Sequence, residues 1–142
     1  MARAYRLTLG RRIVNSLIRP LIRLGLAGKH QYLLTVRGRK SGRLYSTPVT
    51  LIENEDGRWL VAPYGEVSWV RNARSSGEVM LSRGGRSETV KIEEVSPGEA
   101  APVLREYLTR VPVVRPFFDL TAESPPEDIE AEAPRHPVFR IR

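Results

Sequence analysis

The residues best suited to chemistry in this sequence form a basic, glycine-containing stretch. Residues 37–43 read Arg-Gly-Arg-Lys-Ser-Gly-Arg, which places four cations, two glycines and a hydroxyl between two stretches that favour β-strands. Backbone N–H groups and Lys and Arg side chains together suit a bound anion. We therefore expect the negative end of a ligand to bind here. The alternative is an ordinary hairpin tip whose charges are only solvated.

The sequence offers few residues for metal binding or for nucleophilic catalysis. The chain has no cysteine, which excludes disulfides and thiolate metal sites, and its two histidines, His30 and His136, are far apart. We therefore expect no metal site. The sequence also shows no plausible pair of nucleophile and base, which agrees with a reaction that a bound cofactor carries out.

The net charge of +7 and the isoelectric point near 10.4 indicate an acidic partner. That partner is a nucleic acid, an anionic membrane surface, or a phosphorylated or carboxylated ligand. Arginine dominates the cations, which favours bidentate contacts with phosphate or carboxylate, although a general arginine bias is an alternative. No helix-turn-helix, zinc or RNP-type signature is present, so we expect no nucleic acid partner.

Short strands joined by turns must position the basic stretch. Alternation and β-forming residues predict strands over 31–36, 44–54, 58–62, 78–83, 86–95 and 136–142. Helices are predicted over 69–75, with Ser68 as its cap, and over 97–110. The fold class is mainly β with flanking helices (α+β), an antiparallel sheet that closes into a small barrel. We expect residues 1–142 to form a single domain.

Residues 1–28 are predicted to form an amphipathic helix. Ile13, Leu17, Leu21 and Leu24 share one face, while Pro20 should kink the helix. This helix either covers the domain's own core or rests through residues 11–24 on an anionic membrane surface. The segment is too short and too charged to span a bilayer, and it lacks the features of a signal peptide. We expect a cytoplasmic protein, with the inner face of the membrane as the alternative place of contact.

A proline-rich, acidic stretch lies near the other end of the chain. Its acidic residues are Glu123, Glu127, Asp128, Glu130 and Glu132. We expect residues 121–135 to form an extended acidic surface segment, because such a composition offers little apolar surface to bury.

Four motifs follow one another in the first two thirds of the chain. They are Leu-Leu-Thr-Val-Arg-Gly-Arg-Lys-Ser-Gly-Arg at 33–43, Thr-Pro-Val at 47–49, Trp-Leu-Val-Ala at 59–62 and Trp-Val-Arg-Asn at 69–72. This ordered set resembles the deazaflavin-dependent nitroreductase and quinone reductase family of split β-barrel oxidoreductases. The resemblance covers roughly residues 33–95. It implies a split β-barrel of the flavin- or deazaflavin-binding type, and reduced deazaflavin coenzyme F-420 as the hydride donor, with FMN as the runner-up.

The resemblance also implies which residues form the site. The coenzyme's phosphate and polyglutamate tail would be bound by Arg39, Lys40, Ser41, Gly42 and Arg43. Its ring would be lined by Ala62, Pro63, Tyr64 and Gly65, and closed over by Trp69, Arg71 and Asn72. A pocket for the electron acceptor would be walled by Tyr64, Tyr107, Phe117 and Phe118, although the last three equally suit the core. No catalytic side chain is expected, because the cofactor carries the hydride chemistry.

The predicted function is therefore that of an oxidoreductase. It would pass a hydride from reduced F-420 to a quinone, a nitroaromatic or another small hydrophobic acceptor. The alternatives are a non-catalytic carrier of a flavin or deazaflavin and, further off, a nucleic-acid-binding protein. Neither the acceptor nor the oligomeric state follows from the sequence.

Overall fold

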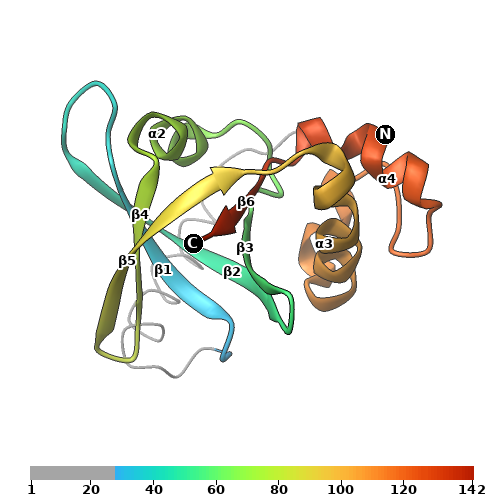
Figure 1. Ribbon diagram of the computed structural model, residues 1–142, viewed down its shortest axis with the longest axis horizontal. Coiled ribbons are helices and arrows are strands. Elements are labelled where there is room, and N and C mark those ends of the chain that lie inside the picture. The colour runs from blue at the N-terminus through green and yellow to red at the C-terminus, as the bar shows by residue number, and fades with distance from the viewer. Residues whose placement is uncertain (1–27) are drawn as a thin grey trace.

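Six antiparallel strands close into a barrel in a computed structural model that describes residues 28–142 (Figure 1). Their order around the barrel is β1-β2-β3-β6-β5-β4. The strands are β1 (Gln31–Arg37), β2 (Leu44–Asn54), β3 (Gly57–Val61), β4 (Glu78–Arg83), β5 (Arg86–Glu94) and β6 (Val138–Ile141). The predicted antiparallel barrel with flanking helices is confirmed. The helix expected over residues 1–28 lies outside the described range, apart from Gly28.

Within residues 28–142, three α-helices and two short 3-10 helices accompany the barrel. They are α2 (Ser68–Ser76), α3 (Pro97–Arg110), α4 (Pro126–Glu132), η1 (Pro112–Phe117) and η2 (Ala133–Arg135). Figure 1 shows α3 and α4 against one side of the barrel, at the right of the view, while the β1–β2 loop projects at the upper left, next to α2. The helix α2 begins one residue earlier than predicted, so its N-cap is Val67 and Ser68 makes no capping bond.

Two hydrophobic cores explain why the helices sit where they do. Side chains alternate between the two faces of a strand, so neighbouring residues enter different cores. Leu51 and Leu60 point into the barrel, where Val70 and Ala73 of α2 join them. Ile52 points outward and packs against α3. Strands covered on both faces in this way are apolar at successive positions, as at residues 51 and 52.

The acidic stretch over residues 121–135 is not an extended segment, which corrects the prediction. Residues 126–132 form α4 and residues 133–135 form η2. Pro126 occupies the first turn, where a helix needs no N–H donor from it, and Glu127 and Asp128 stand at the positive end of the helix dipole. Ile129 is fully buried in the core shared with α3. Prolines and acidic residues therefore start a helix here.

Among residues 28–142, no helix is long and apolar enough to cross a membrane. In the same range, no three His, Asp or Glu side chains are grouped closely enough to hold a metal ion.

Candidate functional site

The basic stretch forms the tip of the β1–β2 hairpin and is closed by its own backbone. The N–H of Gly38 donates to the carbonyl of Arg43 at 2.6 Å, and the N–H of Gly42 donates to the carbonyl of Gly38 at 3.0 Å. Gly42 has a φ of 71°, which suits glycine. A Cβ on Gly38 would stand 2.7 Å from the ring of Tyr45 and 2.9 Å from Ser41 Oγ. The backbone at residue 42 therefore favours glycine, and a side chain at residue 38 would have to displace Tyr45 and Ser41.

Asn72 fastens the basic loop to helix α2. Its side chain is only 5% exposed, and its Oδ1 accepts hydrogen bonds from the backbone N–H of Arg39 at 3.1 Å and from Arg39 Nη1 at 2.8 Å. The helix is itself fixed, because Val70 and Ala73 pack inside the barrel. Two predicted site residues that lie far apart in the chain are thus held together, and the loop has a rigid base.

The backbone donors of the loop are largely used within the protein. Besides Gly38 and Gly42, the N–H of Arg39 bonds Asn72, and the N–H of Arg43 donates to Ser41 Oγ at 3.1 Å. The expectation that backbone N–H groups would hold the anion is therefore not met for these four groups. Side chains, rather than these four N–H groups, are therefore what the loop offers to an anion.

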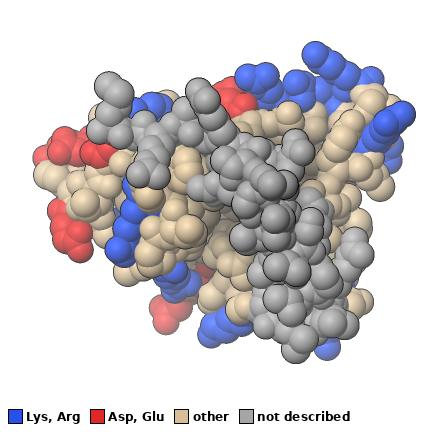
Figure 2. All heavy atoms as spheres, turned by 180° about the vertical axis from the view of Figure 1, so that it is seen from behind, with Lys and Arg blue, Asp and Glu red and all other residues tan. Residues whose placement is uncertain are grey.

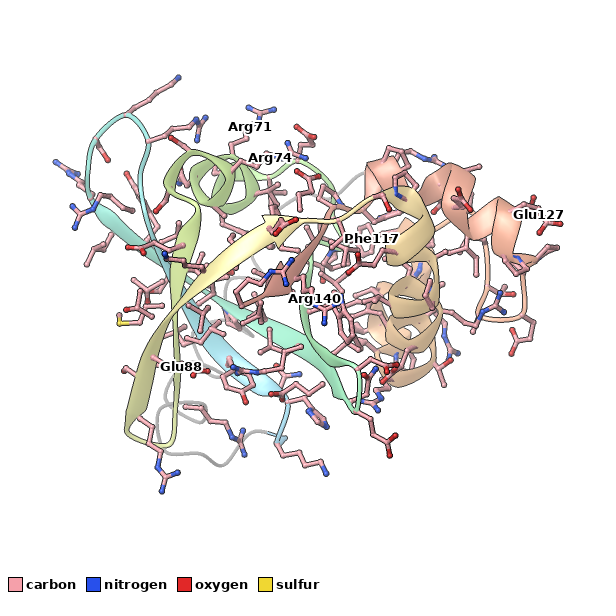
Figure 3. All side chains as sticks on the ribbon, in the orientation of Figure 1. Arg71, Arg74, Glu88, Phe117, Glu127 and Arg140 are labelled. Carbon is pink, nitrogen blue, oxygen red and sulfur yellow. The ribbon has the colours of Figure 1, made fainter. Side chains whose placement is uncertain are left out.

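Three exposed cations around the loop are available for such a ligand. Within the described range, the side chains of Lys40, Arg43 and Arg71 form no hydrogen bond or ion pair with another residue. Figure 2 shows Lys and Arg gathered at this end of the molecule, and Figure 3 shows Arg71 projecting from α2 away from the barrel. By contrast, Arg74 on the same helix bridges Glu66 and Glu94 at 2.7 Å each. Positive charge without an internal counter-ion favours an external anion.

The loop predicted to line the ring, residues 62–65, leads directly into α2. Ala62 and Pro63 are buried, and Ala62 belongs to the barrel core. Tyr64 and Gly65 are partly exposed, as is Trp69, whose ring lies 6.3 Å from that of Phe139. Only the last three of these predicted residues, Tyr64, Gly65 and Trp69, therefore offer side-chain or backbone surface to a ligand.

The aromatic residues predicted for an acceptor pocket lie mostly in the core. Tyr107, Phe117 and Phe118 are 4%, 7% and 6% exposed and pack between the barrel and the helices. Burial, with a smaller contribution from nearby Tyr64, raises the pKa of Tyr107. Phe117, labelled in Figure 3, meets Tyr64 edge-to-face with ring centroids 4.8 Å apart. Phe117 thus packs directly against Tyr64, and the place of these aromatic residues in an acceptor pocket stays a prediction.

Two buried residues that the sequence did not single out support the 62–65 loop. His136 Nδ1 lies 2.9 Å from the carbonyl oxygen of Pro63, and His136 Nε2 lies 2.7 Å from Glu132. No sequence spacing connects residues 63 and 136, so only the fold reveals this contact.

We expect Asn72→Ala to release the basic loop. The change leaves the N–H and guanidinium of Arg39 without their acceptor, and the loss of bonds to a charged group should lower the free energy of unfolding by about 1–3 kcal/mol. Hydrogen exchange of residues 38–43 should also become faster. Ser75→Ala, an exposed change on the same helix, is the control for both measurements. Unchanged exchange in Asn72→Ala would mean that the hairpin holds its own shape.

The six-stranded barrel with its flanking helices has the architecture of the split β-barrel proteins. Residues 11–116 match the family model described as F420H(2)-dependent quinone reductase. The chain belongs to this family, and the predicted resemblance and the F-420 cofactor are thereby confirmed. No curated protein matches the chain.

Solved structures share the fold at low sequence identity. A protein of unknown function from Agrobacterium tumefaciens str. C58, Atu2129, aligns with a TM-score of 0.59 and 16% identity over 80% of this chain and 48% of its own, so this chain spans about half of its length. A structure described as a domain-swapped dimer has a TM-score of 0.58 and 16% identity, covering 94% and 96%. An F420-H2 dependent reductase (FDR-A) has a TM-score of 0.50 and 22% identity, covering 80% and 95%.

Proposed function

We propose that this protein is a reductase that transfers a hydride from reduced F-420 to a quinone, a nitroaromatic or a similar activated acceptor. The observation that carries the proposal is the set of three exposed cations, Lys40, Arg43 and Arg71, around a loop that Asn72 fixes to α2. Family membership supplies the cofactor class, and the exposed cations without partners support this loop as the site for its negative part.

The residues present fit this coenzyme. Its phosphodiester and carboxylates make it strongly anionic, and Lys and Arg side chains form strong charge-assisted bonds with both groups. Because Arg39 is held by Asn72 at 2.8 Å, we assign it to shaping the loop, and we assign Lys40 and Arg43 to the tail itself. Arg71 would add a third contact from the helix. FMN has one phosphate and no polyglutamate, so it would use fewer of these cations.

The protein itself would then bind the coenzyme, orient its ring and shield the ring from water. The bound coenzyme supplies the hydride. Tyr64 and Gly65 would face its ring, with Phe117 behind Tyr64 at 4.8 Å limiting the movement of that side chain. Trp69, at the start of α2, would close the site beside them.

Titration with both cofactors tests the proposal. We expect F-420 to bind more tightly than FMN at low salt, and the difference to shrink as salt rises, because exposed charge contacts are screened. Equal affinities at low salt, or a preference for FMN, would contradict the proposed site. Absorbance of the purified protein gives an independent check, since bound deazaflavin absorbs in the violet and flavin in the blue.

A quinone and nitroaromatic screen separates the reductase from a non-catalytic carrier. Oxidation of bound, reduced F-420 should become faster when an acceptor is added. Tight coenzyme binding with no acceptor-dependent oxidation across the screen would favour the carrier.

Membrane contact through residues 11–24 also remains a proposal, which concerns residues outside the described range. Each Arg near an anionic surface contributes about 1 kcal/mol to binding. The intact chain should therefore pellet with anionic vesicles and be released by salt. A variant with Arg11, Arg12, Arg19 and Arg23 changed to Gln should stay in solution. If the intact chain already stays in the supernatant at low salt, this helix serves only the fold.

A further inference from the structure

A buried pair of ionisable side chains, Glu132 and His136, lies behind the loop of residues 62–65. They are 5% and 4% exposed, and His136 Nε2 stands 2.7 Å from Glu132 Oε2. On the other side of the ring, His136 Nδ1 lies 2.9 Å from the carbonyl oxygen of Pro63. Phe118 stacks on the imidazole with centroids 3.7 Å apart and planes 15° apart. The imidazole is therefore fixed on both edges and on one face.

Glu132 is held from its other sides. Its carboxylate accepts hydrogen bonds from the backbone N–H of Asp119 at 3.2 and 3.1 Å and from Arg135 Nη2 at 3.0 Å. Arg135 also bonds the carboxylate of Asp119 at 3.0 Å. A buried carboxylate needs such partners, and here they join α4, η2 and the turn after η1 into one rigid support.

The hydrogen-bond partners of His136 determine how many protons the Glu132–His136 pair carries. Both neighbours of the imidazole, a carbonyl and a carboxylate, accept hydrogen bonds, so the two contacts together require two protons on the His–Glu pair. Burial lowers the pKa of His136 below its ordinary value, although hydrogen bonds to the Pro63 carbonyl and Glu132 act in the opposite direction. The two contacts with oxygen therefore offset only part of the cost of placing a charged imidazole in the interior.

The same support holds the 62–65 loop at two further points. The N–H of Ala62 donates to the carbonyl of Pro137 at 2.8 Å. Gly65 has a φ of 87°, and a Cβ there would lie 3.3 Å from the carbonyl oxygen of Arg135. Residues 135–137 thus lie against the loop at Ala62, Pro63 and Gly65, on both sides of Tyr64 in the sequence.

We propose that Glu132 and His136 are positioning residues for the coenzyme ring: they hold the Pro63 carbonyl and thereby fix Tyr64 and Gly65 where the ring binds. The inference rests on the proposed function. Both residues lie beyond the stretch 11–116 that matches the family model, so the family match assigns them no role. The proposed tail site lies on the β1–β2 hairpin, whereas residues 62–65 connect β3 to α2, so ring orientation and tail affinity should be separable.

The principal test compares His136→Phe with Glu130→Gln. Phe keeps an aromatic ring to stack on Phe118 but removes both hydrogen bonds, whereas Glu130 is exposed on the same helix as Glu132. In the coenzyme-free protein, hydrogen exchange of residues 62–66 should accelerate at least tenfold in His136→Phe and stay unchanged in Glu130→Gln. With F-420 bound, the absorbance of the ring should shift, and the single-turnover rate of hydride transfer should fall tenfold or more, while the Kd stays within threefold of the wild-type value.

A second pair of variants keeps the test decisive if His136→Phe folds poorly. Glu132→Gln retains the size of the side chain but weakens its hydrogen bond to His136. We expect hydrogen exchange of residues 62–66, ring absorbance and hydride-transfer rate to change in the same direction as in His136→Phe, but by less. His136→Gln can still donate to the Pro63 carbonyl, so it should restore part of the rate. Unchanged exchange of residues 62–66 together with an unchanged spectrum and rate in these variants would overturn the inference. Failure of the wild-type protein to bind F-420 would instead overturn the proposed function, and the exchange measurement would still decide whether the pair holds the loop.

Discussion

Replacing Lys40 and Arg43 together by Ala is expected to weaken F-420 binding strongly. Both side chains are exposed and lack partners within residues 28–142, so the double change removes cations without dismantling the protein's own bonds. Each lost charge-assisted contact is expected to cost about 1.5–3 kcal/mol. Each lost contact therefore corresponds to a rise of about tenfold or more in Kd. Titration of the coenzyme at low salt measures the effect.

The matched control removes one Lys and one Arg at the other end of the barrel. Lys29 and Arg86 are exposed, and that end is tied together by Arg83 Nη1, which donates to the carbonyl of Gly28 at 2.6 Å. The double variant Lys29→Ala, Arg86→Ala has the same net charge as the test variant. It should keep Kd within about threefold, because charges beyond a Debye length of about 10 Å are largely screened. Equal losses of F-420 affinity in both double variants would indicate a general attraction between the basic protein and the anionic coenzyme. No loss of affinity in either variant would mean that the tail binds elsewhere.

Ile129→Ala is expected to have the largest effect on stability. Ile129 is fully buried between α3, α4 and the barrel. Truncating a buried Ile removes apolar contacts and leaves a cavity, which typically lowers the free energy of unfolding by about 2–5 kcal/mol. Urea denaturation followed by circular dichroism measures this loss.

Glu130→Ala on the same helix is the control for that experiment. Glu130 is exposed, and surface changes of this kind usually alter stability by about 0.5 kcal/mol or less. If Ile129→Ala lowers the free energy of unfolding by less than about 1 kcal/mol, the space left by the side chain has closed without a cavity. Such closure would mean that α4 is only loosely attached and can move. The acidic stretch would then behave as the surface segment that its composition suggests.

The strands illustrate how much local sequence determines. β2 and β4 have the predicted bounds, and β1, β3 and β5 differ from prediction by one residue at one or both ends. Their turns carry the needed signals, such as Glu-Asp-Gly where β2 turns into β3, with Gly57 as the first residue of β3, and the glycine pair between β4 and β5. The last strand is shorter than predicted, Val138–Ile141, because His136 and Pro137 are used to hold the 62–65 loop.

The acidic stretch shows where composition misleads. Seven of its residues, Pro126–Glu132, form a helix, although prolines and acidic residues dominate there. The signals were present, with Pro126 in the first turn, two acidic residues after it, and Ile129 and Ala133 one turn apart. They predict a helix only if an apolar surface exists to receive Ile129, and that surface comes from α3 and the outer face of the barrel.

The sequence by itself determined most of the strands and the basic loop, because these depend on residue types at short spacings. The family and the cofactor class followed from the resemblance of its motifs to a known family, which the family match confirms. The tertiary structure decided which cations are free, since Arg39 bonds Asn72 while Lys40 and Arg43 have no partner among residues 28–142. It also decided that Tyr107, Phe117 and Phe118 are core residues, and that the buried Glu132–His136 pair supports residues 62–65. Such contacts join residues far apart in the chain, and only the closure of the barrel and the packing of the helices bring them together.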